Sequence, residues 1–402
     1  MPNPTSFQTI IPHLAAISGS EHCSSDRSSL VVAPESTDEV SKILSFANEA
    51  RIMVNPVGGG TKQAWGSVSN ALLLLKTRRL NKVQEHAWQD MTCTVAAGCT
   101  WAAMQDVLGQ HGQFVALDPL WPDKATIGGI AATNDSGSLR LKYGSLRDLV
   151  IGMTVVLADG TIARSGGKVV KNVAGYDLHK LMIGAFGTLG ILTEITFRLH
   201  SIPLHTQTLT YGCENPEPLG QFLMKVLDSQ FSSQALQLRS DKKQFYVDLQ
   251  LSSFPEVISE QTGSLALIAA ALGLSETGAE RSVWRARQEL FGQQESIVIK
   301  ATVFPDQIAS LALAIHGLGG VSVTQASGIM TANIPAVASP SLLTLRQRVE
   351  LSGGSLTILE SSPAVDEDPW GSPGDSFALM REIKQRFDRN RILNPSRFIG
   401  GI

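Results

Sequence analysis

The stretch from Pro119 to Gly137, PLWPDKATIGGIAATNDSG, is dominated by small side chains. They belong to Thr126, Gly128, Gly129, Ala131, Ala132, Thr133, Ser136 and Gly137. A continuous file of small residues leaves room for a bulky group against the backbone, and a diphosphate joined to a flat ring system would fit there. Close packing of a helix on a sheet also selects small residues and stays open as an alternative.

Two further glycine-rich segments lie in the first half of the chain. The sequence VGGGT at 57–61 follows a predicted strand, and GAFGTLGILT at 184–193 leads into another. Successive glycine N–H groups can form an anion-binding concavity, although an ordinary tight turn has the same composition. The first segment has neither GxGxxG nor P-loop spacing. One large cofactor site explains three such segments better than three unrelated turns do.

Length and charge narrow the class of protein. The 402 residues correspond to two or three domains of ordinary size. A formal net charge of −3 gives no bulk attraction to nucleic acid or to an anionic membrane. No apolar run approaches the roughly 20 residues of a membrane-spanning helix, and the N-terminus does not resemble a signal peptide. We therefore expect a cytoplasmic protein that binds no nucleic acid and is attached to a membrane only through a partner.

Cysteine and histidine spacing predicts no metal site. Cys23, Cys93, Cys99 and Cys213 show no CxxC pair, which disfavours a disulfide scaffold, a structural zinc and an iron–sulfur cluster. The last 200 or so residues contain only two histidines. These are His205 and His316, and neither has a second histidine at ligand spacing.

The order of elements predicts an α+β protein with a boundary near residue 203. Ser36-Thr-Asp-Glu39 has the sequence of a capping box before an amphipathic helix. Asp159-Gly160 separates two apolar runs and predicts a hairpin with a type I′ turn. Residues 191–199 alternate apolar and polar, which is typical of a half-buried strand.

Taken together, these motifs resemble the FAD-binding domain of the vanillyl-alcohol-oxidase and p-cresol-methylhydroxylase superfamily. They are VGGGT, TIGGIAATNDSG, YGSLRDLVIGMTVVLADGTI and KNVAGYDLHKLMIGAFGTLGILTEITFRL, in that order. Within the superfamily, KVVKNVAGYDLHKL at 168–181 and RFDRNRILNPSRF at 386–398 resemble the FAD-binding subunits of bacterial glycolate oxidases.

The resemblance implies an organisation and a set of cofactor contacts. It implies a helical lead-in over 1–24, a two-subdomain FAD-binding domain over 25–203, and a smaller α+β cap over 204–402 whose C-terminal end returns to the flavin domain. Carried over by position, the FAD contacts are Pro56, Val57, Gly58, Gly59, Gly60, Thr61, Asp118, Pro119, Thr126, Gly128, Gly129, Thr133, Asn134, Ser136, Gly137, Tyr143, Gly144, Asp148, Val150, Gly190 and Ile191. Thr61-Lys62 stand where covalent members carry a histidine, so we expect non-covalent FAD.

The same resemblance implies oxidation of a small 2-hydroxy acid, above all glycolate to glyoxylate, in a complex with a sister flavoprotein and an iron–sulfur subunit. Such a reaction needs a cation for the substrate carboxylate and a base or metal for the hydroxyl proton. Lys300, inside the apolar run IVIKATV, is the candidate carboxylate anchor, because a charge there must face outward or meet an anion. Arg285 and Arg287 are alternatives, although a solvated helix face explains them equally.

Departures from the family pattern keep a second reading open. The relatives carry histidines in the cap and a late GGxxRW pattern, whereas Gly353-Gly-Ser-Leu-Thr-Ile358 lacks the arginine and tryptophan. The chain would then be a non-catalytic FAD-holding or electron-relay subunit beside a catalytic sister flavoprotein. An oxidase of a different alcohol is a third possibility. The basic residues between Arg164 and Lys180 could form a rim for an acidic partner or be ordinary solvated surface.

Overall fold

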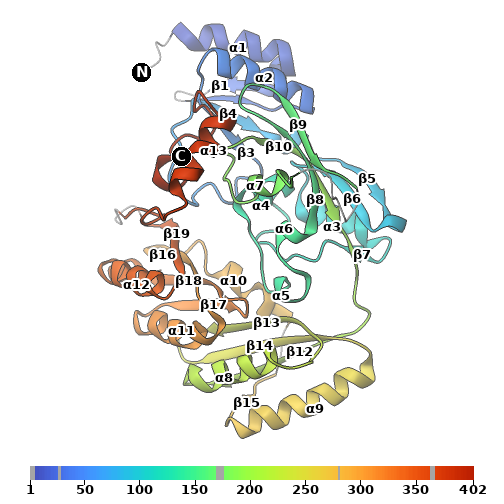
Figure 1. Ribbon diagram of the computed structural model, residues 1–402, viewed down its shortest axis with the longest axis vertical. Coiled ribbons are helices and arrows are strands. Elements are labelled where there is room, and N and C mark those ends of the chain that lie inside the picture. Colours follow the sequence, from blue (N-terminus) through green and yellow to red (C-terminus); the bar gives the residue numbers. More distant parts are fainter. Residues whose placement is uncertain (1–4, 26–28, 169–175, 279–280, 363–366) are drawn as a thin grey trace. The chain divides into compact units, whose positions relative to one another are not determined.

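The computed structural model describes residues 5–25, 29–168, 176–278, 281–362 and 367–402. The chain folds into two units, shown in Figure 1. The first comprises Met1–Asp135, Ser145–Ser201 and Ser372–Ile402, and the second comprises Ser136–Gly144 and Ile202–Gly371. Helices and strands are mixed in both units, and the predicted α+β class is confirmed. The main boundary between the two units falls near residue 203. The segment 136–144 nevertheless groups with the second unit, and the last thirty or so residues group with the first.

A small mixed sheet with two helices forms one half of the first unit. Its strands are β1 (Cys23–Ser25), β2 (Leu30–Val32), β4 (Leu73–Lys76) and β3 (Val54–Val57), in that spatial order. Strand β1 pairs antiparallel with β2, and the other strand pairs are parallel. The helices are α1 (Thr5–Ser18) and α2 (Thr37–Glu49). The expected cap of α2 is present in part. Ser36 accepts from the N–H of Glu39, but the Glu39 carboxylate accepts from the N–H of Glu35, one residue before the position that a capping box uses.

A five-stranded antiparallel sheet forms the other half of this unit. Its order is β5 (Val83–Ala87), β6 (Thr92–Ala96), β10 (Ile191–Arg198), β8 (Val150–Val156) and β9 (Ile162–Gly166). The helices of this half are α3 (Trp101–Gly109), α4 (Ile127–Thr133), α6 (Leu146–Leu149) and α7 (His179–Met182), and β7 (Gln113–Phe114) pairs with β11 (His200–Ser201). Strand β10 is buried at six of its eight positions, so the prediction of a half-buried strand is wrong. It lies between two neighbouring strands and is covered on both faces.

The β8–β9 hairpin has a longer turn than predicted. Leu157 and Thr161 close the loop through a backbone hydrogen bond, and only Gly160 has a positive φ, of 86°. A type I′ turn requires positive φ at both central residues, so Asp159 does not form one. Gly160 is instead the left-handed residue that ends the turn. A Cβ there would lie 2.7 Å from the Ser41 carbonyl oxygen, which also excludes larger residues.

The C-terminal segment adds to the edge of the small sheet. After α13 (Phe377–Phe387), the chain runs beside β3, where Val54 pairs with Leu393 in a parallel bridge. The N–H of Val54 donates to the carbonyl of Ile392 (2.7 Å), and the N–H of Asn394 donates to the carbonyl of Val54 (2.8 Å). The end of the chain therefore lies next to the strand that leads into the VGGGT loop.

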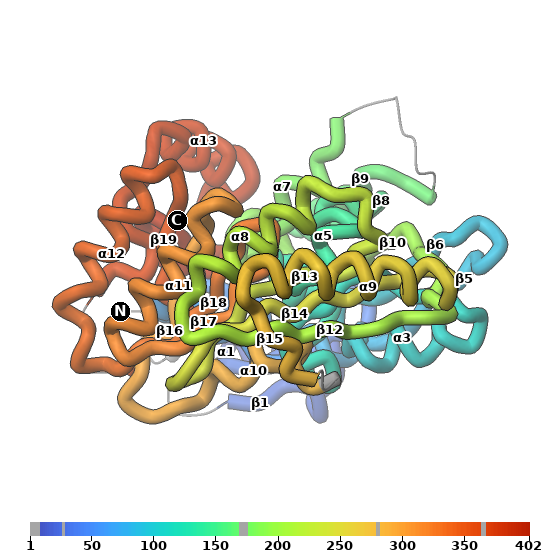
Figure 2. The backbone as a smooth tube through the Cα atoms, turned by 90° about the horizontal axis from the view of Figure 1, so that it is seen from below, coloured from blue at the N-terminus to red at the C-terminus, as the bar shows by residue number. Residues whose placement is uncertain are grey.

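The second unit is built on one eight-stranded antiparallel sheet. Its order is β15 (Ser275–Glu276), β12 (Thr206–Cys213), β14 (Phe245–Ser252), β13 (Ser233–Ser240), β17 (Val321–Gln325), β18 (Ile329–Pro335), β16 (Ser296–Thr302) and β19 (Ser355–Ser361). The longer helices are α8 (Pro216–Leu227), α9 (Pro255–Ala271), α11 (Ile308–Gly317) and α12 (Ser339–Leu351), and they share one apolar core with the sheet. Figure 2 shows α9 running in front of the strands.

The opposite face of this sheet is polar. Asp248 is fully buried and accepts hydrogen bonds from Thr210 (2.9 Å), Gln237 (3.0 Å) and Arg239 (2.8 Å). The segment 136–144, which contains the short helix α5 (Arg140–Tyr143), lies against this face. Ser138 donates to Gln237 (2.9 Å). These contacts explain why this short piece of chain groups with the second unit.

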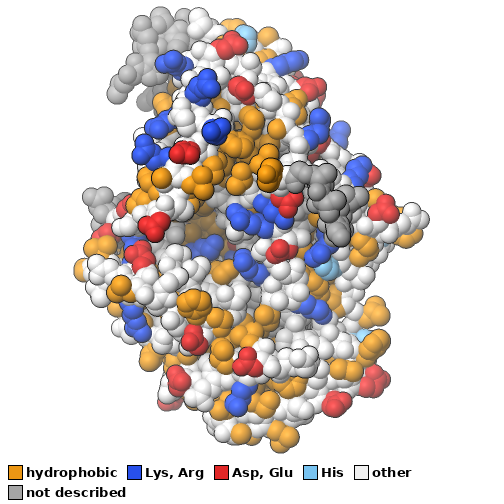
Figure 3. Space-filling view, in the orientation of Figure 1, with side chains coloured by type: hydrophobic (Ala, Val, Ile, Leu, Met, Phe, Trp, Pro, Cys, Tyr) orange, Lys and Arg blue, Asp and Glu red, His pale blue; other side chains and the backbone are white. Residues whose placement is uncertain are grey.

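On the face seen in Figure 3, basic and acidic side chains are intermixed. This distribution agrees with the small net charge. Within the described ranges, no helix combines the length and the apolar composition needed to cross a membrane. All four cysteines are free thiols.

Candidate functional site

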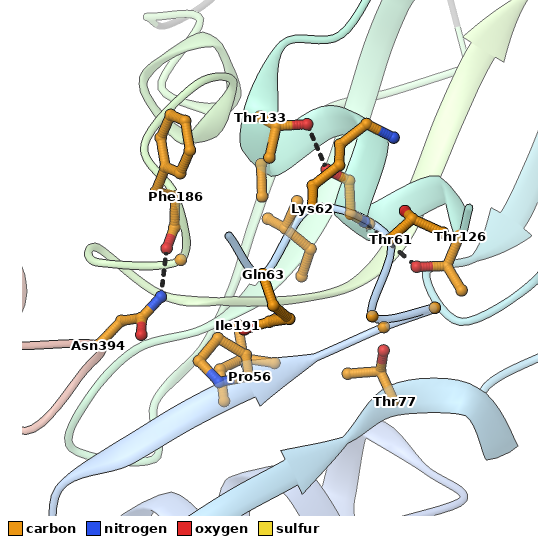
Figure 4. A pocket seen from close by; sticks show the side chains of 18 of the residues that line it. Pro56, Thr61, Lys62, Gln63, Thr77, Thr126, Thr133, Phe186, Ile191 and Asn394 are labelled. Atoms are coloured by element: carbon orange, nitrogen blue, oxygen red, sulfur yellow. Dashed lines mark hydrogen bonds between the residues drawn. The ribbon is translucent and has the colours of Figure 1, made fainter. Parts of the chain in front are cut away.

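A pocket of the first unit gathers residues from all three glycine-rich segments. Its lining residues surround about 700 Å³ of space, a volume that includes open solvent. Its walls are the loop after β3, helix α4, the turn before β10 and the C-terminal segment (Figure 4). The lining residues are Pro56, Gly58, Gly59, Gly60, Thr61, Lys62, Gln63, Thr77, Thr126, Gly128, Gly129, Ala132, Thr133, Phe186, Gly187, Gly190, Ile191, Leu192, Asn394 and Arg397. The predicted convergence on one site therefore holds for these segments.

The loop after β3 offers unused backbone donors. In the described part of the chain, the N–H groups of Gly59, Gly60 and Thr61 donate to no backbone or side-chain acceptor. Gly60 has φ +73°, and nothing lies within 4 Å of the position of a Cβ there. Consecutive free N–H groups in such a turn attract anionic oxygens. This loop is the natural anion-binding element of the pocket.

We expected the pocket glycines to leave room for a ligand, but at most of them protein atoms occupy the place of a side chain. A Cβ built on Gly58 would lie 2.1 Å from Oγ1 of Thr126, and one on Gly59 would lie 1.9 Å from the Lys124 carbonyl oxygen. The corresponding distances are 2.9 Å at Gly128, 2.7 Å at Gly187 and 2.5 Å at Gly190, again to protein atoms. At these five positions the missing side chain lets protein segments approach one another. The alternative of close packing therefore accounts for most of these glycines, and the segments still line one pocket.

Helix α4 supplies a wall and uses its own first N–H groups. Ile127 donates to the Cys99 carbonyl (2.9 Å) and Gly128 to the Ala97 carbonyl (2.7 Å). The N–H of Gly129 donates to Oγ1 of Thr126, the N-cap residue (3.3 Å). The first turn of α4 is therefore already satisfied. Gly129 is the open position on this wall, because a Cβ there would meet only Thr126 Oγ1, at 3.2 Å.

Lys62 brings a buried positive charge to the pocket. Its side chain is 5% exposed, and its Nζ lies 3.2 Å from Oδ2 of Asp135, which is 1% exposed. Asp135 also accepts from the N–H of Leu120 (2.8 Å). The rings of Trp65 and Trp121 lie with their centroids 5.6 and 5.3 Å from Nζ. A carboxylate and two aromatic faces thus stabilise a charge that burial alone would disfavour.

The C-terminal segment completes the wall with Asn394 and Arg397. Arg397 is 4% exposed and donates from Nη2 to the Lys62 carbonyl (3.0 Å). Burial lowers the pKa of its guanidinium to about 10, so it remains charged at neutral pH. Asn394 donates from Nδ2 to the carbonyl of Phe186 (2.6 Å), a contact drawn in Figure 4. Two cations, Lys62 and Arg397, and one carboxylate, Asp135, give this pocket a net positive charge, which favours an anion.

Eleven of the predicted contact residues line the pocket. They are Pro56, Gly58, Gly59, Gly60, Thr61, Thr126, Gly128, Gly129, Thr133, Gly190 and Ile191. Val57 is the last residue of β3, directly before the loop. Asn134 follows Thr133 as the C-cap of α4, with φ +49° and a buried Oδ1 that has no partner within the described ranges.

The remaining predicted contact residues do not line this pocket. Asp118 and the buried Pro119 belong to the connection between β7 and α4, and Val150 begins β8. Asp148 accepts from both the N–H (2.7 Å) and the hydroxyl (2.6 Å) of Ser145, which gives it a local role in capping α6. Ser136, Gly137, Tyr143 and Gly144 belong to the second unit.

Sequence reasoning missed several lining residues, among them Lys62, Thr77, Phe186 and Arg397. Lys62 immediately follows the glycine loop, and a lysine directly after GGGT was a usable signal. Arg397 lies within the NPSR turn, but nothing in the sequence shows that this turn meets the β3 loop. Such long-range contacts have no local pattern.

Candidate substrate residues belong to the second unit. Lys300 lies half-buried in the middle of β16, opposite Thr331 and Thr357 of the neighbouring strands. Arg287 is not simply solvated, because its Nη1 donates to the Ser136 carbonyl (2.6 Å), whereas Arg285 is exposed. Among the described residues, no three His, Cys, Asp or Glu side chains cluster as metal ligands. Lys171 of the basic run lies outside the described residues, and Lys168 and Lys180 pair with Glu85 and Asp177.

Comparison with proteins of known sequence supports the cofactor assignment. Residues 28–166 match the family described as an FAD binding domain. The glycolate oxidase subunit GlcD of Bacillus subtilis (strain 168) is 39% identical over 198 residues, which cover 49% of this chain and 42% of that protein. The mitochondrial D-lactate dehydrogenase (cytochrome) of Arabidopsis thaliana is 39% identical over 178 residues, covering 44% of this chain and 31% of that protein. The chain spans less than half the length of these two relatives.

A match over most of the chain is found at lower identity. The D-2-hydroxyglutarate dehydrogenase of Xanthomonas citri pv. viticola is 27% identical over 424 residues, covering 91% of this chain and 88% of that protein. Among solved structures, p-cresol methylhydroxylase with substrate bound has a TM-score of 0.76 at 15% identity, with 98% of this chain and 97% of that chain covered. Alkyldihydroxyacetonephosphate synthase has a TM-score of 0.72 at 16% identity, with 99% and 87% covered. Residues 28–166 are thus similar to an FAD binding domain, and the chain shares the fold of p-cresol methylhydroxylase.

Proposed function

We propose that the chain binds FAD non-covalently in the pocket of the first unit and takes part in the oxidation of a small 2-hydroxy acid. The relatives named above act on glycolate, D-lactate and D-2-hydroxyglutarate, which share a hydroxyl on the carbon next to a carboxylate. Glycolate is our first choice, as part of a complex with a sister flavoprotein and an iron–sulfur subunit. A place in the cytoplasm, with membrane attachment only through a partner, completes the proposal.

The single observation that carries the FAD part is the pocket itself. The free N–H groups of Gly59, Gly60 and Thr61 suit a diphosphate, and the buried charges of Lys62 and Arg397 suit its negative charge. The Oδ1 of Asn394, which has no hydrogen-bond partner among the described residues, suits a hydroxyl or ring N–H of the cofactor. When bound, FAD would supply the electron-pair acceptor for a hydride from the substrate C2–H. In this chain, Thr61-Lys62 occupy the position after the glycine loop, and no histidine is there to form a covalent link.

The residues that would meet substrate are proposed from the second unit. Lys300 is the candidate anchor for the substrate carboxylate, since it is a half-buried cation in the middle of an apolar strand. The contacts Asp118, Pro119, Val57, Asn134, Ser136, Gly137, Tyr143, Gly144, Asp148 and Val150 remain predictions from the resemblance.

A second candidate function is an FAD-holding or electron-relay subunit that does no substrate chemistry. The departure at Gly353–Ile358 from the relatives' late arginine and tryptophan favours it. An anaerobic titration separates the two functions. The purified chain, loaded with FAD, is mixed with glycolate, D-lactate or D-2-hydroxyglutarate, and the flavin absorbance is followed. Bleaching by one of the acids supports oxidation by this chain, whereas a flavin that stays oxidised with all three supports the accessory role.

A further inference from the structure

The side chain of Asn394 has an acceptor turned toward the pocket that nothing in the described chain satisfies. Asn394 is 4% exposed and lines the pocket. Its Nδ2 is committed, because it donates to the Phe186 carbonyl at 2.6 Å. This bond fixes the orientation of the amide and leaves Oδ1 as the free end. Oδ1 is buried and has no hydrogen-bond partner within the described ranges. A buried amide oxygen without a donor is destabilising, so its presence calls for an explanation.

Backbone strain lies on both sides of this contact. Phe186 has φ +53° and Asn394 has φ +44°, which places both in the left-handed region. A bulky residue such as phenylalanine rarely adopts that conformation. Strained residues that the surrounding structure holds in place are concentrated at ligand sites. Here two of them meet through one hydrogen bond in the pocket wall.

Contacts within the protein hold this arrangement in place. The N–H of Asn394 donates to the Val54 carbonyl (2.8 Å), which ties it to the strand that leads into the glycine loop. The preceding carbonyl, that of Leu393, accepts from the buried ammonium of Lys384 (2.9 Å). The ring of Phe186 stacks on Phe398, with centroids 5.7 Å apart. These protein contacts therefore fix the position of the acceptor in the pocket wall.

We propose that Asn394 is a cofactor-binding residue whose Oδ1 accepts a hydrogen bond from an O–H or N–H group of FAD. This inference rests on the proposed function, in that FAD is the occupant of the pocket. FAD carries donors of the required kind in its ribityl chain, its ring system and its adenine amino group. Asn394 therefore adds a neutral contact, made by the end of the chain, to the anion-binding loop at 58–61.

The test uses Asn394→Gly, because glycine adopts a positive φ without strain and removes only the side chain. Apoprotein is titrated with FAD and the quenching of flavin fluorescence gives the dissociation constant. We expect affinity to fall about tenfold, the loss of one hydrogen bond. Asn390→Ala is the matched control on the same segment, since Asn390 is exposed and, among the described residues, its amide N–H groups donate to Asn48 alone. It should bind FAD like the wild type.

The melting temperature with and without FAD separates binding from folding. If Asn394 only held Phe186 in place, Asn394→Gly would melt earlier to the same extent in both forms, and the inference would be overturned. If Oδ1 contacts FAD, the rise in melting temperature on FAD addition is smaller in the variant than in the wild type. Wild-type chain that binds no FAD would instead contradict the proposed function. Equal affinity of wild type and variant would contradict this inference alone.

Discussion

The Nζ atom of Lys384 lies 2.7 Å from Oδ2 of Asp388, and both side chains are buried. The same ammonium donates to the carbonyls of Thr188 (2.8 Å) and Leu393 (2.9 Å). Asp388 in turn accepts from the N–H groups of Ile392 and Leu393. This pair joins α13 to the turn before β10 and to the C-terminal segment, and the latter two line the pocket.

Replacing Lys384 by Met should destabilise the chain strongly. Asp388 would remain buried without its cation, and breaking a buried pair in this way costs about 3–5 kcal/mol. The free energy of unfolding in urea measures the loss. Lys180→Met is the control, because Lys180 pairs with Asp177 at the surface, both roughly 40% exposed, and should cost less than about 1 kcal/mol. Similar losses in the two variants would show that the buried pair is not a structural link.

Gly129→Val should reduce FAD retention without unfolding the chain. A side chain at Gly129 meets only Thr126 Oγ1 among protein atoms within 4 Å, so its added volume enters the pocket. The flavin-to-protein absorbance ratio after gel filtration measures retention. Gly263→Val is the matched control, since Gly263 lies in helix α9 with nothing within 4 Å of its Cβ position. Full flavin content in Gly129→Val would contradict the assignment of α4 to the wall of the FAD site.

The sequence predicts the bounds of single helices and strands better than it predicts why the glycines are needed. Strand β10 ends one residue before the predicted run 191–199, and α2 begins directly after the predicted N-cap Ser36, because alternation and capping are local signals. The glycine segments locate the pocket correctly. Their physical reason was misjudged, because a sequence does not show whether a missing Cβ faces a ligand or, as at Gly59, a backbone carbonyl.

Contacts between distant segments could not be predicted from the sequence. Lys62 pairs with Asp135, and Asn394 with Phe186, and neither pair is joined by any periodic pattern. The β8–β9 turn shows the same limit on a small scale. Asp-Gly fits a type I′ turn by composition, but the loop closes one residue further out, between Leu157 and Thr161.

The thiols should react in the order of their burial. Burial raises the pKa of the Cys93 thiol to about 12, and it also raises the pKa of Cys99. Both are therefore protonated at pH 8, and since the thiolate is the nucleophile, both should resist alkylation in the folded chain. Cys23 and Cys213 are only partly buried and should be modified before Cys93 and Cys99. Mass spectrometry after a short iodoacetamide pulse measures the extent of alkylation at each cysteine. Rapid labelling of Cys93 without denaturant would contradict the burial of this thiol.

The most direct test of the central claim, that the pocket of the first unit holds FAD without a covalent bond, is a titration of apoprotein with FAD followed by acid precipitation. We predict saturation at one FAD per chain and release of all flavin into the supernatant. Lys62→Met should weaken binding by about tenfold or more, because it removes a buried positive charge from the pocket wall. It also leaves Asp135 buried without its cation, so the melting temperature of the apoprotein is measured beside the affinity. A folded chain that takes up no FAD, or a flavin that stays with the precipitated protein, would contradict the account.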